Sequence, residues 1–474
     1  MTIPLSRRQF LASSAAVGAG VLLPGTAAAA NYTAPPPGPP YWDRVLILIE
    51  LDGGNDGLNT VIPFDVAEYN DLRPNLRYSE NALEDAGTIL TGRTGTYQTT
   101  RGGVSAQQQF ALNPGMTHLR AAWNPTNSAT DDLAIVLGVG YANGNLSHFR
   151  SMDIWNGGAT AADFPSNNWL GRLFSGLTPP STLTAHGALL SRYSSNPLRS
   201  ATGVRYLAMA HPFEFIKRSY EVIDADPATV SSPQFKHLLT TAHEVYQASG
   251  KFRGAMARLK TDATTPYEAD DYEYNPPSFT PSSGITFNDK SAFERGCRAI
   301  AEMIATNRSA VAADKRLQIP VFKIQIGGFD THAGQRTSTV DRHGDLLAQV
   351  SSGMASIRAA LKQHPGLWER TLIMTYSEFG RRVEENASSG TDHGTSSCHL
   401  LLGGGIKGGF YGAQPGLWRQ SWNSQTDDLD DRGNLKYTVD FRNLYATAAS
   451  WLGLPFGSDP YLGSATPLDC FATP

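Results

Sequence analysis

This sequence of 474 residues lacks several features that would each indicate a particular class of protein. It has only three cysteines, Cys297, Cys398 and Cys470, and their wide spacing matches no zinc-ligand pattern. One disulfide and one free thiol are compatible with that number, whereas a disulfide framework is not. The 39 lysines and arginines are slightly outnumbered by 43 aspartates and glutamates. The composition therefore implies no basic surface for nucleic acid or anionic lipid.

A long apolar run is also missing. The N-terminal stretch from about Leu11 to Leu23 is short and interrupted by serine and glycine, so it is too weak for a strong membrane span. It follows the segment Ser6-Arg7-Arg8-Gln9-Phe10 and precedes Ala27–Ala30, which is the pattern of a twin-arginine export signal. We expect residues 1–30 to be a cleaved signal peptide and the twin-arginine translocase to be a partner during export. The mature protein should then be periplasmic or secreted, exported folded and without a stable membrane span. An uncleaved anchor is the alternative.

The remaining chain is organised around one expected domain. Residues 31–41 are rich in proline and predict an extended linker. Residues 42–474 are interpreted as a single α/β domain with insertions near 75–109 and 260–289, because both stretches lack clear periodicity and resemble surface loops or lids. Length alone would also permit two or three domains.

Apolar runs of strand length alternate with helical patterns along this domain. Strands are predicted at the runs listed here: 45–51, 133–139, 319–326, 372–376 and 399–402. Their nearly continuous apolar character is typical of strands buried on both faces of a parallel sheet. Residues 341–362 carry apolar side chains every three or four positions, which predicts a helix with one buried face. The fold class is therefore expected to be α/β, a doubly wound, mostly parallel sheet with helices on both faces.

Acidic and imidazole side chains gather where these strands end. They follow apolar runs or lie in glycine-flanked loops, and the set is Asp52, Asp330, His332, Glu378, Asp392 and His393. Ligands of α/β sheets collect at the carboxyl ends of strands, so these groups should meet in space. Oxygen and imidazole ligands together predict a divalent metal centre with one or two ions, and zinc, manganese, calcium and magnesium all remain open. Asp52 has a second interpretation as the cap of a following turn.

Two further residues in this part of the chain have competing interpretations. His343 lies on the predicted helix 341–362, where packing or support of the site is favoured over direct binding. Arg381 follows Glu378 closely and suits either the oxygens of a phosphate or sulfate group or an ion pair within the protein.

The motifs from LILIELDGGNDGLNTVIP through NLSHFRSMDIW, GGFDTHAGQ, TYSEFGRR and GTDHG to LLLGGGIKGGFYG cover nearly the whole mature chain. In them the chain resembles a family of exported bacterial proteins, domain of unknown function 1501, which is grouped with the alkaline phosphatase superfamily. The resemblance implies an alkaline-phosphatase-like fold. Asp52 looks like the early metal ligand of the superfamily, Asp330 and His332 look like a later pair, and His393 resembles the last histidine ligand. Phe379 stands where the superfamily has a histidine, and Asp330 and His332 are closer together than usual. Two metals or one therefore remain open.

The resemblance also implies a nucleophile after an early strand, a place that Ser147 occupies, with His148 and Arg150 as catalytic neighbours. Ser147 has a second interpretation as a helix cap, and His148 as a metal ligand or oxyanion contact. The expected function is hydrolysis of phosphate or sulfate esters by a metal-activated serine or water, with a small-molecule or polysaccharide-linked ester as substrate. The alternative is a non-catalytic exported binding or assembly protein with a structural metal.

Overall fold

The structure is a computed structural model that describes residues 40–100, 105–124, 132–190, 195–200, 203–209, 287–288, 291–307, 317–420 and 427–472. All of them lie within the compact unit formed by residues 37–474. The predicted signal peptide and almost all of the predicted linker fall outside the described residues, as does the second predicted insertion except for Phe287 and Asn288.

Strand β1 (Val45–Asp52) lies inside the main sheet, hydrogen-bonded in parallel to β9 (Val321–Gly327) on one side and to β10 (Thr371–Tyr376) on the other. Its alternate side chains face opposite layers, because successive residues of a strand point to opposite sides of the sheet. Ile47 and Ile49 enter one hydrophobic core, while Leu46 and Leu48 enter another. A strand buried on both faces needs an apolar side chain at nearly every position, which is what VLILIEL supplies.

The main sheet has eleven strands in the order β4-β3-β14-β6-β13-β10-β1-β9-β7-β8, with β15 beside β6. The strands not yet introduced are β3 (Gly95–Gln98), β4 (Ala106–Gln108), β6 (Leu133–Gly140), β7 (Gly187–Leu190), β8 (Tyr206–Met209), β13 (Ser397–Gly403), β14 (Gly409–Pro415) and β15 (Val439–Asp440). Only β13 and β4 pair in an antiparallel direction within it, so the sheet is mostly parallel.

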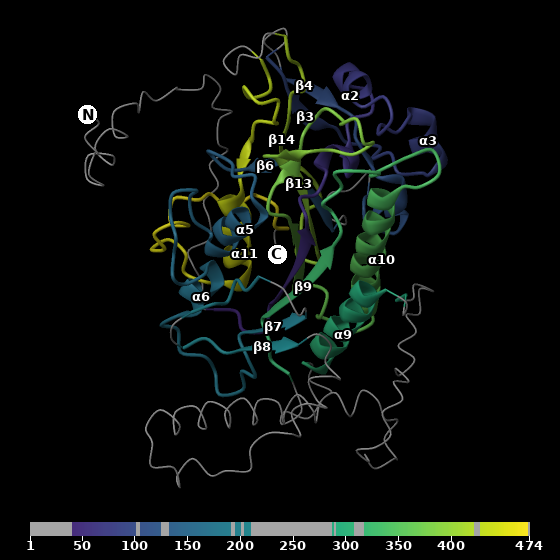
Figure 1. The fold of residues 1–474 in the computed structure, drawn as a ribbon. Helices are drawn as coiled ribbons and strands as arrows, with labels where there is room; N and C mark the ends of the chain where they lie inside the picture. The colour runs from purple at the N-terminus through teal and green to yellow at the C-terminus, as the bar shows by residue number, and fades with distance from the viewer. Residues whose placement is uncertain are drawn as a thin grey trace, which may run out of the picture. The chain divides into compact units, whose positions relative to one another are not determined.

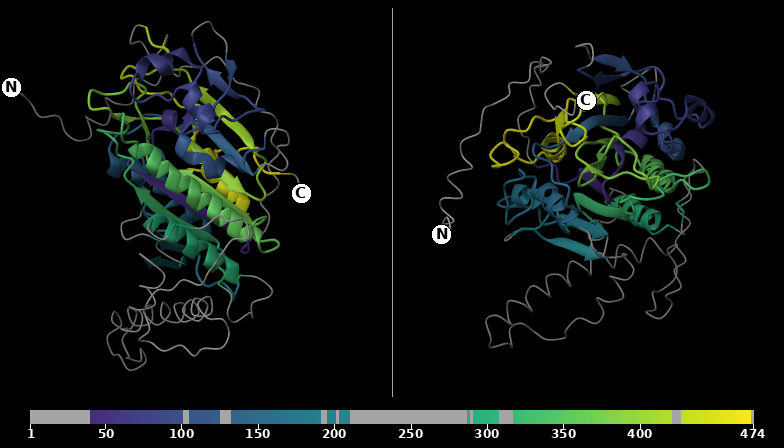
Figure 2. Two further views of the ribbon diagram at one scale, coloured as in Figure 1. Left: turned by 90° about the vertical axis from the view of Figure 1, so that its right-hand side faces the viewer. Right: turned by 45° about the horizontal axis from the view of Figure 1, so that its top comes forward.

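Helices cover both faces of this sheet (Figure 1). On one face lie α4 (Thr117–Arg120), α9 (Ala292–Thr306) and α10 (Arg342–Lys362), which pack on the core that contains Ile47. On the other lie α5 (His148–Gly157), α6 (Trp169–Phe174) and α11 (Phe441–Leu452), which pack on the core that contains Leu46. Figure 2 shows α9 and α10 together against the strands. The expected fold class, a doubly wound and mostly parallel α/β sheet, is confirmed.

Short elements complete the chain beside this framework. They are α2 (Ala67–Leu72), α3 (Glu80–Asp85), the strand pair β2 (Val61–Ile62) with β5 (Ala111–Leu112), and the pair β11 (Gly380–Arg381) with β12 (His393–Gly394). Part of the stretch 75–109 therefore differs from a loop: it contains α3, and its strands β3 and β4 extend the main sheet at one edge. Periodicity is weak there because such short strands have few residues over which a pattern can repeat.

Two other expectations are decided by the structure. The run 399–402 is a buried strand, β13, but it is antiparallel to both β10 and β6. An antiparallel return needs no crossover helix, and none lies between β10 and β13. All three cysteines are buried free thiols, so the option of one disulfide is not realised. Among the residues described, no helix is long and apolar enough to cross a membrane.

Candidate metal centre

Four loops meet at one edge of the sheet, where β1, β9, β10 and β6 end. Asp52 lies opposite Gly327 and Glu50 opposite Tyr376 in the strand register, so these strands stop at nearly the same level. Because β13 is antiparallel, it starts at this edge, with Ser397 beside Val139 near the end of β6. The loops that follow the four parallel strands carry the acidic and imidazole residues singled out in the sequence.

Glycine at the end of β1 permits the closest approach of two of these loops. Gly53 has φ +120°, and a Cβ atom placed there would lie 2.2 Å from the backbone nitrogen of Asp330. Any other side chain would push the two loops apart. The glycine of the DGG sequence therefore allows the loop after β9 to rest directly on the loop after β1.

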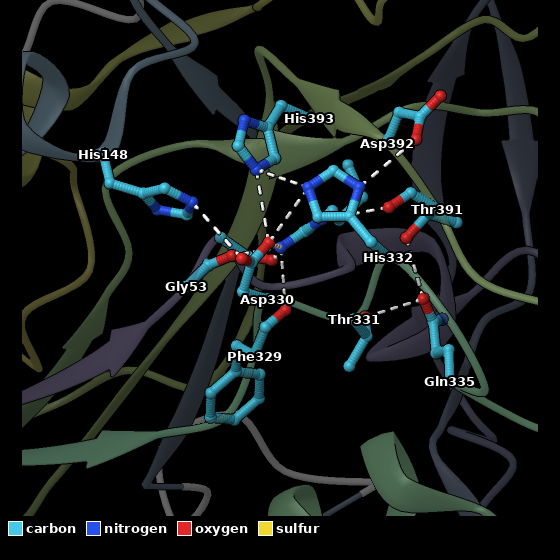
Figure 3. A network of polar contacts seen from close by, with 12 residues as sticks. Gly53, His148, Phe329, Asp330, Thr331, His332, Gln335, Thr391, Asp392 and His393 are labelled. Carbon is cyan, nitrogen blue, oxygen red and sulfur yellow. Dashed lines mark hydrogen bonds and ion pairs between the residues drawn. The ribbon is translucent and has the colours of Figure 1, made fainter.

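The Asp330 carboxylate is at the centre of a group of three histidines, drawn in Figure 3. Its Oδ1 lies 3.2 Å from Nε2 of His332 and 3.2 Å from Nε2 of His393. Its Oδ2 lies 3.6 Å from Nε2 of His148. Each of the three imidazoles thus presents the same nitrogen, Nε2, to one carboxylate. We call Asp330, His148, His332 and His393 the outer cluster.

The other ring nitrogen of each histidine is held by an oxygen acceptor. Nδ1 of His148 lies 2.8 Å from Oε1 of Glu378, and Nδ1 of His332 lies 3.2 Å from Oδ1 of Asp392. Nδ1 of His393 lies 2.8 Å from the carbonyl oxygen of Leu146. A carbonyl only accepts, so Nδ1 of His393 carries a hydrogen, and the two carboxylates favour the same tautomer in the other rings. The lone pairs of all three Nε2 atoms then face Asp330.

This arrangement fits a divalent metal. Nε2 of His332 lies 2.9 Å from Nε2 of His393, and with both Nδ1 atoms protonated neither Nε2 has a hydrogen to donate. Two lone pairs at that distance repel unless a cation, a proton or a metal ion, is shared between them. Among the described residues, ligand atoms of His148, Asp330 and His393 all lie within 4.8 Å of one another, so these three groups can hold a metal ion. Acceptors on Nδ1 are the usual orienting partners of metal-binding histidines.

A buried arginine compensates part of the negative charge. Arg381 donates to Oδ1 of Asp330 at 2.6 Å, to the carbonyl of Phe329 at 3.0 Å and to that of Thr391 at 2.9 Å. Burial alone would raise the pKa of Asp330, but the hydrogen bond and charge of Arg381, with His393 and His332, lower it overall. The hydrogen bond to Glu378 raises the pKa of His148 above its ordinary value, whereas burial lowers that of His393.

A family model described as "Protein of unknown function (DUF1501)" matches residues 43–458. The chain belongs to this family. A model of the twin-arginine translocation pathway signal sequence matches residues 4–24, so this member of the family is exported by the twin-arginine translocase and is periplasmic or secreted. A search of curated proteins finds no match.

Two solved structures match this chain at low similarity. One is titled "Crystal structure of Ps i-CgsB in complex with k-i-k-neocarrahexaose", with 12% identity and a TM-score of 0.35 over 89% of this chain and 75% of the other. The second is a phosphonate monoester hydrolase of Agrobacterium radiobacter, with 12% identity and a TM-score of 0.28 over 90% of this chain and 78% of the other.

Asp52 and Glu378 lie beside the outer cluster in this DUF1501 protein. Glu378 is buried and accepts hydrogen bonds from the backbone of Gly53 (2.9 Å) and from His148. Burial, followed by the charges of Glu378 and Glu50, raises the pKa of Asp52. The ring of Phe379 packs on His148 and His393, with centroids 4.9 and 4.6 Å apart. Neither carboxylate belongs to a group of three close ligand atoms among the described residues.

The structure separates the three residues expected to be catalytic. His148 joins the outer cluster through Nε2. Ser147, next to it, is exposed at the N-cap of α5, yet its hydroxyl makes no capping hydrogen bond to that helix. Arg150 is directed elsewhere: its guanidinium donates to the carbonyls of Ala161 (2.8 Å) and Asp163 (2.6 Å) and lies over the ring of Phe164. The structure therefore does not bring Arg150 to the site, because backbone carbonyls satisfy it locally.

Beneath the outer cluster lies a second group of polar side chains, of which the sequence analysis singled out only His343. Asp56 and Arg73 form a buried ion pair at 2.6 Å, and Gln335 donates to Asp56 at 2.6 Å. His343 is buried, as the favoured interpretation held, and its Nε2 lies 3.0 Å from Oδ1 of Asn55. We call Asp56, Arg73, Gln335 and His343, with Asn55, the inner cluster. In the sequence, Asn55 and Asp56 belong to the motif DGGNDG and Gln335 ends the motif GGFDTHAGQ, whereas Arg73 and His343 lie outside both.

Proposed function

We propose that this exported protein is a metal-dependent hydrolase of phosphate or sulfate esters. The observation that carries the proposal is the convergence of three imidazole Nε2 atoms on Asp330 while each Nδ1 is held by an oxygen acceptor. Packing does not explain it, because the side chains of Asp330 and His332 are 47% and 46% exposed. Groups that repel one another at a partly open surface are best explained by a bound cation.

We expect one metal ion, held by Nε2 of His148, by Asp330 and by Nε2 of His393, with His332 as a further ligand. A second ion beside Asp52 and Glu378 is disfavoured, because Phe379 has no ligand atom and Glu378 already accepts from Gly53 and His148. Imidazole ligands suit zinc and related transition ions better than calcium or magnesium. Asp52, with its raised pKa, is placed in this proposal as a proton donor or acceptor near the site rather than as a ligand.

When bound, such a metal lowers the pKa of a hydroxyl or water beside it and stabilises negative charge on the ester oxygens. Ser147 directly precedes the proposed ligand His148, its side chain is exposed, and its hydroxyl is not used to cap α5. Attack by its oxygen on phosphorus or sulfur would expel the alcohol and leave an ester on Ser147, which water then hydrolyses. The first-turn N–H groups of α5 have no partner within the helix and favour an anionic group.

The test combines metal content with turnover on mature protein purified after native export. We expect about one equivalent of a transition metal and hydrolysis of at least one ester in a panel of phosphate mono- and diesters and sulfate esters. Ser147→Ala should keep the metal and lose at least about 100-fold in kcat, the scale of a lost nucleophile or oxyanion contact. Ser79→Ala is the matched control, because Ser79 is also an exposed N-cap serine and its hydroxyl does cap its helix, α3. It should cost about 1 kcal/mol of stability and leave kcat unchanged.

The second candidate function is a non-catalytic exported binding or assembly protein with a structural metal. It is favoured by one specific observation: Arg381 and Arg150, the arginines nearest the site in sequence, are both committed to contacts within the protein. Metal-loaded protein that hydrolyses no ester, with Ser147→Ala indistinguishable from the parent in metal content, would support this function over hydrolysis. Folded protein that contains no metal after native export would contradict both.

A further inference from the structure

Gln335 links three of the loops that build the site through its side-chain amide. The residue is fully buried. Its Oε1 accepts hydrogen bonds from Oγ1 of Thr331 (2.9 Å) and Oγ1 of Thr391 (2.7 Å), as Figure 3 shows. Its Nε2 donates to Oδ2 of Asp56 at 2.6 Å. The carboxylate of Asp56 can only accept there, so it fixes which end of the amide faces the threonines.

Both threonines are direct neighbours of outer-cluster residues. Thr331 lies between Asp330 and His332, and Thr391 precedes Asp392 and His393. The backbone nitrogen of Thr391 also donates to the carbonyl of Thr331 at 3.1 Å, so the two segments run side by side. A displacement of either threonine therefore moves a ligand-bearing segment relative to the other.

The support behind Gln335 is rigid. Asp56 is paired with Arg73, and the two side chains are 1% and 0% exposed. Arg73 in turn donates to the carbonyls of Val383 (2.6 Å) and Arg382 (2.7 Å), in the loop that follows β10. The position of Gln335 is thus set by the loop after β1 and by the loop after β10, while it holds the loop after β9.

We propose that Gln335 is a positioning residue that sets the metal affinity of the outer cluster. The proposal rests on the proposed function only in that it requires a metal at that cluster. A glutamine is the one side chain of this size that offers a donor to a carboxylate and an acceptor to two hydroxyls at once. Its replacement by leucine leaves the shape of the side chain almost unchanged but removes the hydrogen bonds that connect both threonines to Asp56. The two ligand-bearing segments are then no longer held in position relative to each other by this amide.

The test is titration of metal-free mature protein with Co²⁺, followed by its d–d absorption. Gln335→Leu should bind Co²⁺ about 10- to 100-fold more weakly than the parent and with an altered band shape, the effect usual for partners behind metal ligands. The matched control is Gln318→Leu. Gln318 is also buried, with Nε2 donating to Asp43 (3.0 Å) and Oε1 accepting from Thr182 (2.6 Å), but it precedes β9 at the opposite edge of the sheet. It should leave affinity and spectrum unchanged.

A polarity exchange tests the same contact without removing it. Gln335→Glu keeps the acceptor for both threonines but sets a carboxylate against Asp56, and it should weaken Co²⁺ binding. Adding Asp56→Asn restores a donor to that pair, and the double variant should recover most of the affinity lost in Gln335→Glu. The exchange also decides the question if Gln335→Leu does not fold.

The outcomes separate this proposal from the proposed function. If the parent binds Co²⁺ and both Gln335→Leu and Gln335→Glu bind it with the parent's affinity and spectrum, the positioning role is overturned and the metal centre stands. Equal losses in Gln335→Leu and Gln318→Leu also overturn it, because the effect would then be one of general stability. A parent that binds no Co²⁺ overturns both proposals.

Discussion

The outer and inner clusters lie at the same edge of the sheet and share the loop after β9, yet their polar groups are paired differently. In the inner cluster an anion meets a cation: Asp56 is bound by Arg73 and by the amide of Gln335. In the outer cluster a carboxylate meets three imidazole lone pairs, and two of those lone pairs face each other at 2.9 Å. Arg381 is the only guanidinium that contacts Asp330 among the described residues.

The difference indicates what each cluster is for. Buried charges are stable only when paired and hydrogen-bonded, and in the inner cluster Oδ2 of Asp56 is paired with Arg73 and accepts a hydrogen bond from Gln335. The outer cluster is completed only by a cation. We therefore expect changes in the inner cluster to reduce the free energy of unfolding and changes in the outer cluster to reduce metal affinity. Gln335 is the exception, because its amide contacts Thr331 and Thr391 in the ligand-bearing segments as well as Asp56.

The largest effect on stability is expected from Arg73→Met. It keeps much of the side-chain volume but leaves Asp56 as a buried carboxylate without its cation, and breaking a buried pair in this way costs about 3–5 kcal/mol. Urea unfolding of the metal-free protein measures the loss. Arg442→Met is the control, since Arg442 forms a partly exposed ion pair with Asp440 and should cost less than about 1 kcal/mol. Equal midpoints for the two variants would show that the inner cluster is not a stabilising unit.

The next largest effect is expected from Asp330→Asn, and it should appear in metal binding. Asparagine still offers an oxygen to Arg381, and the position is about half exposed, so the metal-free protein should unfold nearly as the parent does. Loss of the central anion should weaken Zn²⁺ binding by at least about 100-fold. A saturating metal at about 100 times its dissociation constant stabilises the parent by about 2.7 kcal/mol, and the variant should lose that increment.

Asp392→Asn should have a smaller effect on Zn²⁺ affinity than Asp330→Asn. Asp392 contacts only one histidine of the cluster, at Nδ1 of His332, so its replacement should weaken Zn²⁺ binding about 10-fold, less than the central change. If calorimetric titration showed the same Zn²⁺ affinity for Asp330→Asn as for the parent, the outer cluster would not be the metal site.

The fold was largely predictable because its signals are local. The apolar run at β1 and the helical stripe of α10 each encode their own structure, and α10 begins at Arg342 with Asp341 as its cap. The direction of β13 was not predictable in this way. Its residues are as apolar as those of a parallel strand, and only the path of the chain between β10 and β13 makes it antiparallel.

The site was predictable as a gathering of residues and less so as a set of contacts. Glycine-flanked imidazoles at strand ends led to Asp330, His332 and His393, which do lie together. Sequence could not place the imidazole of His148 beside Asp330, because the orientation of this ring depends on Glu378, 230 residues away, which holds its Nδ1. Gln335 was missed for the same reason: an isolated glutamine has no pattern, and its role exists only through the contacts that the fold creates.

The smallest expected effect concerns pH and distinguishes the histidine of the inner cluster from those of the outer. Burial lowers the pKa of His343 below its ordinary 6.5, so the folded protein keeps this ring neutral where the unfolded chain takes up a proton. Below pH 6.5 the unfolded state then binds more protons, and stability falls as pH falls, by up to about 1.4 kcal/mol per pH unit for this group. His343→Gln keeps a donor for Asn55 and removes the titration, so urea midpoints of the metal-free variant should depend less steeply on pH between 6.5 and 5. His118→Gln, at an exposed position on α4, controls for the loss of an imidazole. If the urea midpoints of His343→Gln depended on pH as steeply as those of the parent, His343 would take up a proton in the folded parent as well. The contrast between an inner cluster paired within the protein and an outer cluster that needs a cation would then fail.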